Sequence, residues 1–445
     1  MDRKWRRFSL LGGVALSALV IGACAAPAPA AAPAAPAAAV EVSTIDVMHA
    51  YGEGVADQPM MVEWGKQFES LNPQYKLKWT WGGSEMGTLF TARMGANDPP
   101  DLIITDDGSL ANFARDGVIQ PITKYLDGKN YEGDATWRDT FYAGVLSNGR
   151  IKDGKAGDGD YGIPDNMHFG AIWYDKGLFE KHSYVIPKTW SELINLCGQI
   201  MTDESRACFG ADNYGSYNSR SHLELMWRMV GGQKVFDTGM GKPGTKFDTP
   251  EFLKAAQLYQ ELTTKHFVSG WEGNQWPAGQ VAWSNHDAAM IFMPSWLPSE
   301  LMTAKAEDFT MGAFPMPSVA GGVEGKPDLE VKFNGWVVPT GAKNPDGAMA
   351  WAKFATSKAY QIARTNRADM PSPLKTVPLP ETMANMQAPI DAANAIRFGG
   401  GWDAEAPEWQ AKVLEPLNTD LAMGKITPED FLKQLDVATA EFYKK

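Results

Sequence analysis

The clearest pattern of apolar positions runs from Tyr161 to Leu196 (YGIPDNMHFGAIWYDKGLFEKHSYVIPKTWSELINL). A short extended run with a proline precedes a mostly apolar, β-favouring run from Phe169 to Tyr174, the kind that a sheet buried on both faces uses. An amphipathic turn of helix follows at Gly177–Lys181. Thr189 with Glu192 three residues later then predicts a capped helix start. The stretch therefore predicts a strand, a helix, a turn and a second helix, in that order.

Elsewhere along the chain, alternating strand-like runs are followed by runs with helical spacing, which is typical of an α/β protein. About 400 mature residues exceed what one hydrophobic core normally supports, so two lobes are expected. We expect strands at 42–49, 75–81 and 101–104, and helices at 60–71, 85–94, 110–117, 222–230, 249–264, 346–356, 380–394 and 428–443.

Residues 1–24 have a basic head, an apolar run too short for a membrane span and a small-residue end, and so predict a signal peptide. The final residues, Ile21-Gly22-Ala23-Cys24, resemble a lipobox, which would make Cys24 the lipidated first residue of the mature protein. The alternative is an ordinary cleaved signal with an incidental cysteine. Whether export follows the general or the twin-arginine route stays open, because Arg6-Arg7 is followed by residues that fit the latter poorly.

Residues 25–40 are almost purely alanine and proline, and no side chain there can build a core. The four prolines oppose a helix, so residues 25–41 predict a semi-extended tether. A tether of this kind fits a domain that must stay near a membrane while it turns freely.

The formal net charge is −12, and removal of residues 1–23, with four basic and one acidic residue, makes it −15. An acidic surface argues against nucleic acid or anionic lipid as a partner, which leaves the lipid anchor as the only predicted membrane contact. If Cys24 carries lipid, Cys197 and Cys208 remain as a pair that forms either a local disulfide or two free thiols. No histidine lies near them with ligand spacing, and we expect neither a metal nor a cofactor.

The segments YGIP, IWYDKGLFEK and PKTWSEL resemble the extracellular solute-binding proteins that feed bacterial ABC importers, in the sugar-binding branch of maltose-binding protein. Asp175 replaces the usual asparagine of this pattern. Further similar segments extend the resemblance over nearly all of residues 42–445. The resemblance implies an α/β, two-lobed periplasmic-binding-protein (Venus flytrap) fold with multiple inter-lobe crossings. The lobes would comprise 42–162 with 291–353, and 163–290 with 354–445.

The resemblance and the strand ends together predict a ligand cleft. In open α/β sheets ligands lie beyond the carboxyl ends of strands, where the run DLIITDD delivers Asp106 and Asp107. A carboxylate there can accept sugar hydroxyls, although Asp107 could instead cap the next helix. Trp296 either stacks on a pyranose ring or packs in the interior. The direction of its side chain stays open, because His286 and Pro294 replace two glycines of the family pattern. The expected ligand-binding residues are Tyr51, Trp81, Glu85, Asp106, Asp107, Asn166, Trp296, Asn334, Gly335, Trp336 and Arg367.

The resemblance implies a monomeric binding protein, anchored to the outer face of the cell membrane or periplasmic, that captures a mono- or oligosaccharide and delivers it to ABC transporter permease subunits. Glu85, Asp106 and Asp107 keep a cationic ligand such as a polyamine as an alternative. A secreted glycoside-active enzyme is disfavoured, because hydrolysis needs two carboxyl groups on opposite faces of one bond. Adjacent residues such as Asp106 and Asp107 point apart and cannot flank a bond, so no enzyme is expected.

Overall fold

The computed structural model describes residues 42–51, 53, 57–213, 217–239, 241–301, 305–322, 328–392, 394–396 and 406–444. The predicted signal peptide, Cys24 and the tether lie outside the described residues. Every described residue belongs to one unit of the chain, residues 41–445. None of the helices in these ranges combines the length and the apolar character that a membrane crossing requires.

A ten-stranded sheet organises the described chain, with the strand order β2-β1-β3-β11-β7-β9-β8. Strand β10 pairs with β7, while β4 and β12 pair with β11. The strands β1, β2 and β3 are mutually parallel, and β11 runs antiparallel to β3 and β7. The strands are β1 (Ser43–His49), β2 (Tyr75–Trp81), β3 (Leu102–Asp106), β4 (Ile119–Gln120), β5 (Arg150–Ile151), β6 (Gly159–Asp160), β7 (Ile163–Asp175), β8 (Ala207–Gly210), β9 (Ala288–Pro294), β10 (Met311–Phe314), β11 (Asp328–Pro339) and β12 (Asn394–Ile396).

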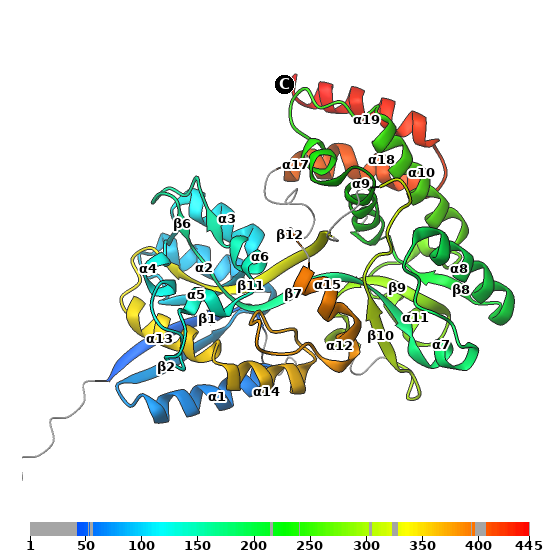
Figure 1. The fold of residues 1–445 in the computed structure, drawn as a ribbon. Helices are drawn as coiled ribbons and strands as arrows, with labels where there is room; N and C mark the ends of the chain where they lie inside the picture. The colour runs from blue at the N-terminus through cyan, green and yellow to red at the C-terminus, as the bar shows by residue number, and fades with distance from the viewer. Residues whose placement is uncertain are drawn as a thin grey trace, which may run out of the picture. The chain divides into compact units, whose positions relative to one another are not determined.

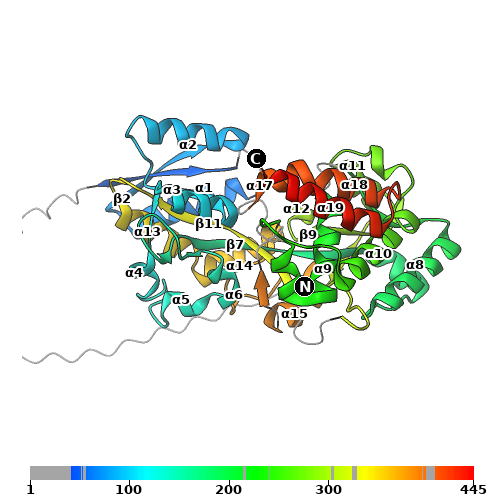
Figure 2. The same ribbon diagram turned by 90° about the horizontal axis from the view of Figure 1, so that it is seen from above.

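Strands β7 and β11 connect two groups of elements. The first half of β7 pairs with β11, and its second half pairs with β9 and β10. In both ribbon views, α1 (Gln58–Leu71), α13 (Pro345–Ala355) and α14 (Lys358–Ala368) lie on one side of this crossing, and α8 (Trp190–Glu204) and α10 (Pro250–Lys265) lie on the other (Figures 1 and 2). The crossing predicted from sequence is therefore made by two long strands.

Each group has its own apolar core, and a third cluster runs along the crossing strands. We call the cluster that contains Val47, Ile104 and Trp351 the first core, and the cluster that contains Trp227 and Phe431 the second core. Successive side chains along β1 and β3 point to opposite faces of the sheet. Neighbouring residues such as Val47 and Met48 therefore belong to different apolar clusters. The sheet is thus covered on both faces, as the apolar strand pattern predicted.

Several helix ends follow the local signals in the sequence. Helix α1 ends at Leu71, directly before Asn72-Pro73. The Thr189 hydroxyl accepts the N–H of Glu192, and the Glu192 carboxylate accepts the N–H of Thr189, which confirms the predicted capping box of α8. The remaining helices are α2 (Met86–Gly95), α3 (Asp107–Asp116), α4 (Thr123–Leu126), α5 (Trp137–Thr140), α6 (Ala143–Ser147), α7 (Lys176–His182), α9 (Tyr217–Thr238), α11 (Ala278–Ser284), α12 (Leu297–Glu300), α15 (Gln387–Ala392), α17 (Pro407–Trp409), α18 (Glu415–Ala422) and α19 (Pro428–Phe442), with short helical turns η1 (Gly83–Glu85), η3 (Trp271–Gly273), η4 (Glu381–Met386) and η6 (Gln410–Leu414).

A disulfide joins α8 to β8. The Sγ atoms of Cys197 and Cys208 are 2.01 Å apart, and their Cα atoms are 5.1 Å apart. Both residues are fully buried in the second core. The disulfide links α8 covalently to the edge strand of the sheet.

Candidate functional site

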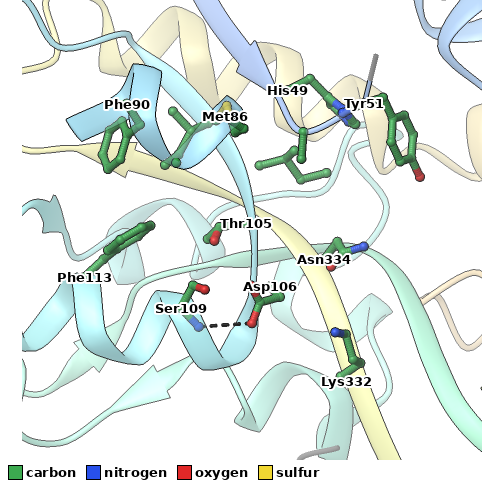
Figure 3. Close-up of a pocket in the computed structure, with 14 residues that line it drawn as sticks. His49, Tyr51, Met86, Phe90, Thr105, Asp106, Ser109, Phe113, Lys332 and Asn334 are labelled. Carbon is green, nitrogen blue, oxygen red and sulfur yellow. Dashed lines mark hydrogen bonds between the residues drawn. The ribbon is translucent and has the colours of Figure 1, made fainter. Parts of the chain in front are cut away.

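A cavity of about 350 Å³ lies at the carboxyl ends of β1 and β3, where His49 and Asp106 end their strands. This position agrees with the rule that ligands of open α/β sheets bind beyond the carboxyl ends of the strands. Its volume lies within the usual range for small-molecule sites. The residues that matter below are His49, Tyr51, Asp106, Ser109, Lys332 and Asn334, with an apolar group from α2 and α3 (Figure 3).

Asp106 carries the negative charge of the cavity and also caps α3. Its Oδ1 accepts the N–H of Gly108 at 3.0 Å. The same oxygen accepts the N–H of Ser109 at 3.1 Å, the bond that Figure 3 marks. Burial raises the pKa of the Asp106 carboxyl, but Lys332 and the hydrogen bonds from Ser109 outweigh burial and leave the pKa below its usual value. Asp106 is therefore an ionised hydrogen-bond acceptor. Because the cap belongs to Asp106, α3 begins at Asp107 rather than at Leu110.

Lys332 links the cavity to Trp296. The Lys332 side chain lines the cavity, and its Nζ lies 5.4 Å from the centroid of the Trp296 ring. The ring of His168, which pairs with Lys332 across β7 and β11, packs edge-on against Trp296 at 5.1 Å. Burial, Lys332 and Arg364 hold the pKa of His168 well below its usual value, so His168 is neutral. Trp296 is half-buried beside the cavity rather than part of its wall.

His49 lines the cavity beside Tyr51. Its Nδ1 accepts the N–H of Tyr51 at 3.0 Å, which places the proton of the neutral ring on Nε2. Burial and Arg364 hold the pKa of His49 well below its usual value. The His49 ring contacts the rings of Tyr51, Trp81 and Trp336 with centroids 4.4, 5.4 and 5.6 Å away. The sequence analysis did not include His49 in the site. The one sequence signal that could have identified it is its position as the last residue of the predicted strand 42–49.

A buried ionic cluster lies behind His49. Arg364 donates from Nε to Asp57 Oδ2 at 2.7 Å, and from Nη1 to the Asp165 carboxylate and to the Asp165 carbonyl. Burial alone would lower the pKa of Arg364, but Asp165 and Asp57 outweigh it and hold this pKa well above its usual value. The cluster joins the start of α1, strand β7 and helix α14. Sequence reasoning missed it because its three members are far apart in the chain.

Two residues expected in the cleft lie elsewhere. Trp336 is fully buried in the first core, and its Nε1 donates to Asp165 Oδ1 at 2.8 Å. His49 lines the cavity and packs against Trp336, which it separates from the cavity. No face of the Trp336 indole is therefore open to a ligand. Arg367 is 55% exposed and pairs with Glu63 at 3.0 Å. Trp336 and Arg367 therefore do not line the cavity.

Other expected residues support the site without lining it. Asp107 is buried, and its Oδ2 accepts Asn148 Nδ2 at 3.1 Å, so its carboxylate points into the interior. Asn166 is fully buried, and its Oδ1 accepts the N–H of Asn334 at 3.2 Å, which ties β7 to β11. At Gly335 an added Cβ would lie 2.5 Å from the Ile163 carbonyl oxygen, so this glycine serves strand packing rather than ligand approach.

Trp81 and Glu85 also lie outside the cavity wall. Trp81 is half-buried and stacks on Trp79 with the ring centroids 4.7 Å apart. Glu85 is exposed directly before α2. Of the expected residues, the structure therefore brings Tyr51, Asp106 and Asn334 together at one cavity. Within the described ranges no group of three or more His, Cys, Asp or Glu residues is placed to hold a metal ion.

Comparison with known proteins gives a family and a fold. Residues 52–362 match the bacterial extracellular solute-binding protein family. The diacetylchitobiose binding protein NgcE of Streptomyces coelicolor is 25% identical over 343 residues, which are 74% of this chain and 66% of that protein. The multiple sugar-binding protein of Streptococcus mutans is 23% identical over 331 residues, which are 71% of this chain and 70% of that protein.

Solved structures of similar fold include a chitin oligosaccharide binding protein, with a TM-score of 0.67 and 20% identity over 91% of this chain and 100% of that chain. Maltose-bound MalE3 of T. maritima has a TM-score of 0.66 and 18% identity over 90% of this chain and 100% of that one.

The likeness to these neighbours shows the α/β, two-lobed periplasmic-binding-protein fold, in which β7 and β11 provide crossings between the lobes. The family match spans more than two thirds of the chain. Members of this family are extracellular receptors for solutes and not enzymes. The chain therefore belongs to the family of bacterial extracellular solute-binding proteins.

Proposed function

We propose that this protein captures a mono- or oligosaccharide in the cleft between its lobes and delivers it to the permease of an ABC importer. The observation that carries the proposal is the ionised Asp106 in a cavity that also presents Lys332, Asn334 and the ring of Tyr51. Ionised groups make the stronger hydrogen bonds to hydroxyls, and an aromatic ring suits the C–H face of a pyranose. The sugar ligands named for the relatives agree with this chemistry.

A polyamine or another cationic ligand is the weaker candidate. The ammonium of Lys332 lines the same cavity as Asp106, and a second cation would be repelled by it. Glu85 and Asp107 favoured a cationic ligand in the sequence analysis. In the structure Glu85 is exposed outside the cavity, and the Asp107 carboxylate points into the interior. A neutral polyhydroxylated ligand meets both charges without this penalty.

The lobe boundaries proposed from sequence are 42–162 with 291–353, and 163–290 with 354–445. The strand pairing supports a modified division. Strands β9 and β10 pair with the second half of β7, which favours placing residues 291–314 with the second lobe. Tyr360, Leu374 and Val377 pack in the first core, which favours placing the chain from 354 to about 377 with the first lobe. Structures with and without ligand test the division, because each lobe moves as one body.

We also propose that Cys24 is lipidated and that residues 25–41 tether a monomer to the outer face of the cell membrane. The lipobox-like end of the signal peptide and the Ala/Pro composition support this proposal. Metabolic labelling with palmitate should mark the wild-type protein and not Cys24→Ser. Label on the variant would contradict the anchor.

Binding is proposed to close the lobes. Polar groups such as Asp106 stay hydrated while the lobes are apart, and a sugar that contacts both lobes makes the closed form favourable. Asn166 and Asn334 join the two crossing strands by a hydrogen bond, which supports the proposal that the lobes turn about this part of the strands.

Calorimetric titration with a panel of mono- and oligosaccharides tests the function, together with melting in the presence of each sugar. We expect at least one sugar to raise the melting temperature and to be recovered unchanged. Asp106→Asn should keep the helix cap, because asparagine caps as well as aspartate, yet lower affinity for that sugar at least about tenfold. Glu85→Gln removes an exposed carboxylate outside the cavity and should leave affinity unchanged. A panel without any binder, or equal effects of both variants, would contradict the proposal.

A further inference from the structure

The cavity has two chemically different ends (Figure 3). Phe90, Phe113 and Met86 lie together at one end, whereas Lys332 and Asn334 lie toward the other. Asp106, Thr105 and Ser109 occupy the space between them. The polar end is the part that the proposed sugar binding uses. The apolar end has no role in that proposal.

The apolar end is built by two facing helices. Met86 and Phe90 come from the first turns of α2, and Phe113 comes from α3. The rings of Phe90 and Phe113 are 5.3 Å apart between centroids, and Ile103 of β3 lies among the same lining residues. None of these side chains carries a nitrogen or oxygen atom, so a ligand hydroxyl placed there would lose its hydrogen bonds to water without gaining comparable ones.

Gly87 keeps space at this helix. It lines the cavity between Met86 and Phe90, and a Cβ added there would meet no heavy atom within 4 Å outside its neighbours. Gly87 is itself exposed, so a larger side chain can be placed at this part of the cavity wall without a clash.

We infer that the site selects sugars that carry a methyl-bearing substituent, such as an acetamido or a 6-deoxy group, which enters the end formed by Met86, Phe90 and Phe113 while the sugar hydroxyls meet Asp106. This inference rests on the proposed function and names its ligand class. A compact group suits a cavity of about 350 Å³ whose apolar end is lined by two phenyl rings 5.3 Å apart between centroids. A pocket of this kind discriminates a missing methyl or methylene about 10–200-fold.

Matched pairs of sugars test the inference by calorimetric titration. The acetamido arm compares N,N′-diacetylchitobiose with cellobiose, and the deoxy arm compares L-fucose with L-galactose and L-rhamnose with L-mannose. We expect the methyl-bearing member of at least one pair to bind about 10-fold tighter or more. The arm that shows the preference identifies the substituent.

Two variants locate the effect. Gly87→Leu places a large side chain at the cavity wall and should abolish the preference, whereas Thr88→Leu changes the next residue of α2, which does not line the cavity, and should retain it. Equal or tighter binding of the plain sugars overturns the inference and leaves sugar binding intact. A preference that survives in Gly87→Leu also overturns it. If Asp106→Asn leaves the affinity of every binding sugar unchanged, both the inference and the proposed function fail.

Discussion

The Lys332 ammonium lies over the indole of Trp296, with Nζ 5.4 Å from the ring centroid. Lys332 belongs to β11 and lines the cavity, while Trp296 follows β9, which pairs with the second half of β7. Lys332 also lowers the pKa of Asp106. The Lys332 side chain therefore lies between the Asp106 carboxylate of the cavity and Trp296, which lies beside the cavity.

Replacement of Trp296 by alanine should weaken sugar binding by about 1–3 kcal/mol, because stacking on a flat ligand is lost. Titration with the sugar that binds the wild type best measures the loss. Tyr131→Ala, which removes a 42% exposed ring that packs on Phe354, serves as the matched control and should keep full affinity. Full affinity in Trp296→Ala would show that this indole only packs against Lys332 and His168.

Trp336 should behave differently. Trp336→Phe removes the donor to Asp165 and leaves a buried acceptor unpaired, which should cost about 1–3 kcal/mol of unfolding free energy. Sugar affinity should change little, because Trp336 does not line the cavity. Urea denaturation and titration of the same preparation separate the two effects. Unchanged stability with lost affinity would restore Trp336 to the binding site.

Arg364 and Arg367 form a matched pair on α14. Arg364 is 1% exposed between Asp57 and Asp165, so Arg364→Met leaves two buried carboxylates without their cation and should cost about 3–5 kcal/mol. Arg367→Ala breaks an exposed pair with Glu63 and should cost less than about 1 kcal/mol. Chemical denaturation curves of both variants give the comparison. Similar losses would mean that the buried cluster does not stabilise the fold.

The pairing of His286 with Asp175 should make stability depend on pH. Partial burial alone would lower the pKa of His286, but hydrogen bonds to Asp175 and Asp308 outweigh it and raise this pKa. A raised pKa in the folded state gives a stabilisation that is complete below the unfolded value of about 6.5 and is lost as pH rises through the folded value.

His286→Asn tests this dependence, because asparagine tolerates the positive φ of 70° found at this position. The melting temperature of the wild type should exceed that of the variant by more at pH 5.5 than at pH 8.5. A difference that stays constant between these two pH values would exclude the charged pair as its source.

The sequence was most informative where local chemistry decides structure. The cap by Thr189 and Glu192 and the stop at Asn72-Pro73 depend on residues a few positions apart, and both are present in the structure. Strand β7 is longer than the predicted run 169–174, because Asp165 and Asn166 are polar yet fully buried. Their burial depends on partners such as Arg364, 199 residues away from Asp165. Periodicity carries no information about such pairs.

The same contrast holds for the cavity. Asp106 was predictable because it lies at the carboxyl end of a strand, and Tyr51 because the family resemblance implies an aromatic residue at the cleft just after the first strand. Lys332 was missed, since a lysine in a strand usually reads as solvent-exposed. Trp336 was misplaced because it lies two residues beyond Asn334 on the same strand, where His49 and Asp165 cover it. That cover comes from distant parts of the chain.

A crystal structure with the tightest-binding sugar of the panel tests the central claim most directly. The sugar should occupy the cavity with hydroxyls within hydrogen-bond distance of the Asp106 carboxylate and of Asn334. Trp296 should lie closer to the cavity than it does in the unbound protein. A sugar bound elsewhere, for example in the separate pocket lined by Val235, Thr249 and Phe252, with Asp106 in contact with water alone, would contradict the account.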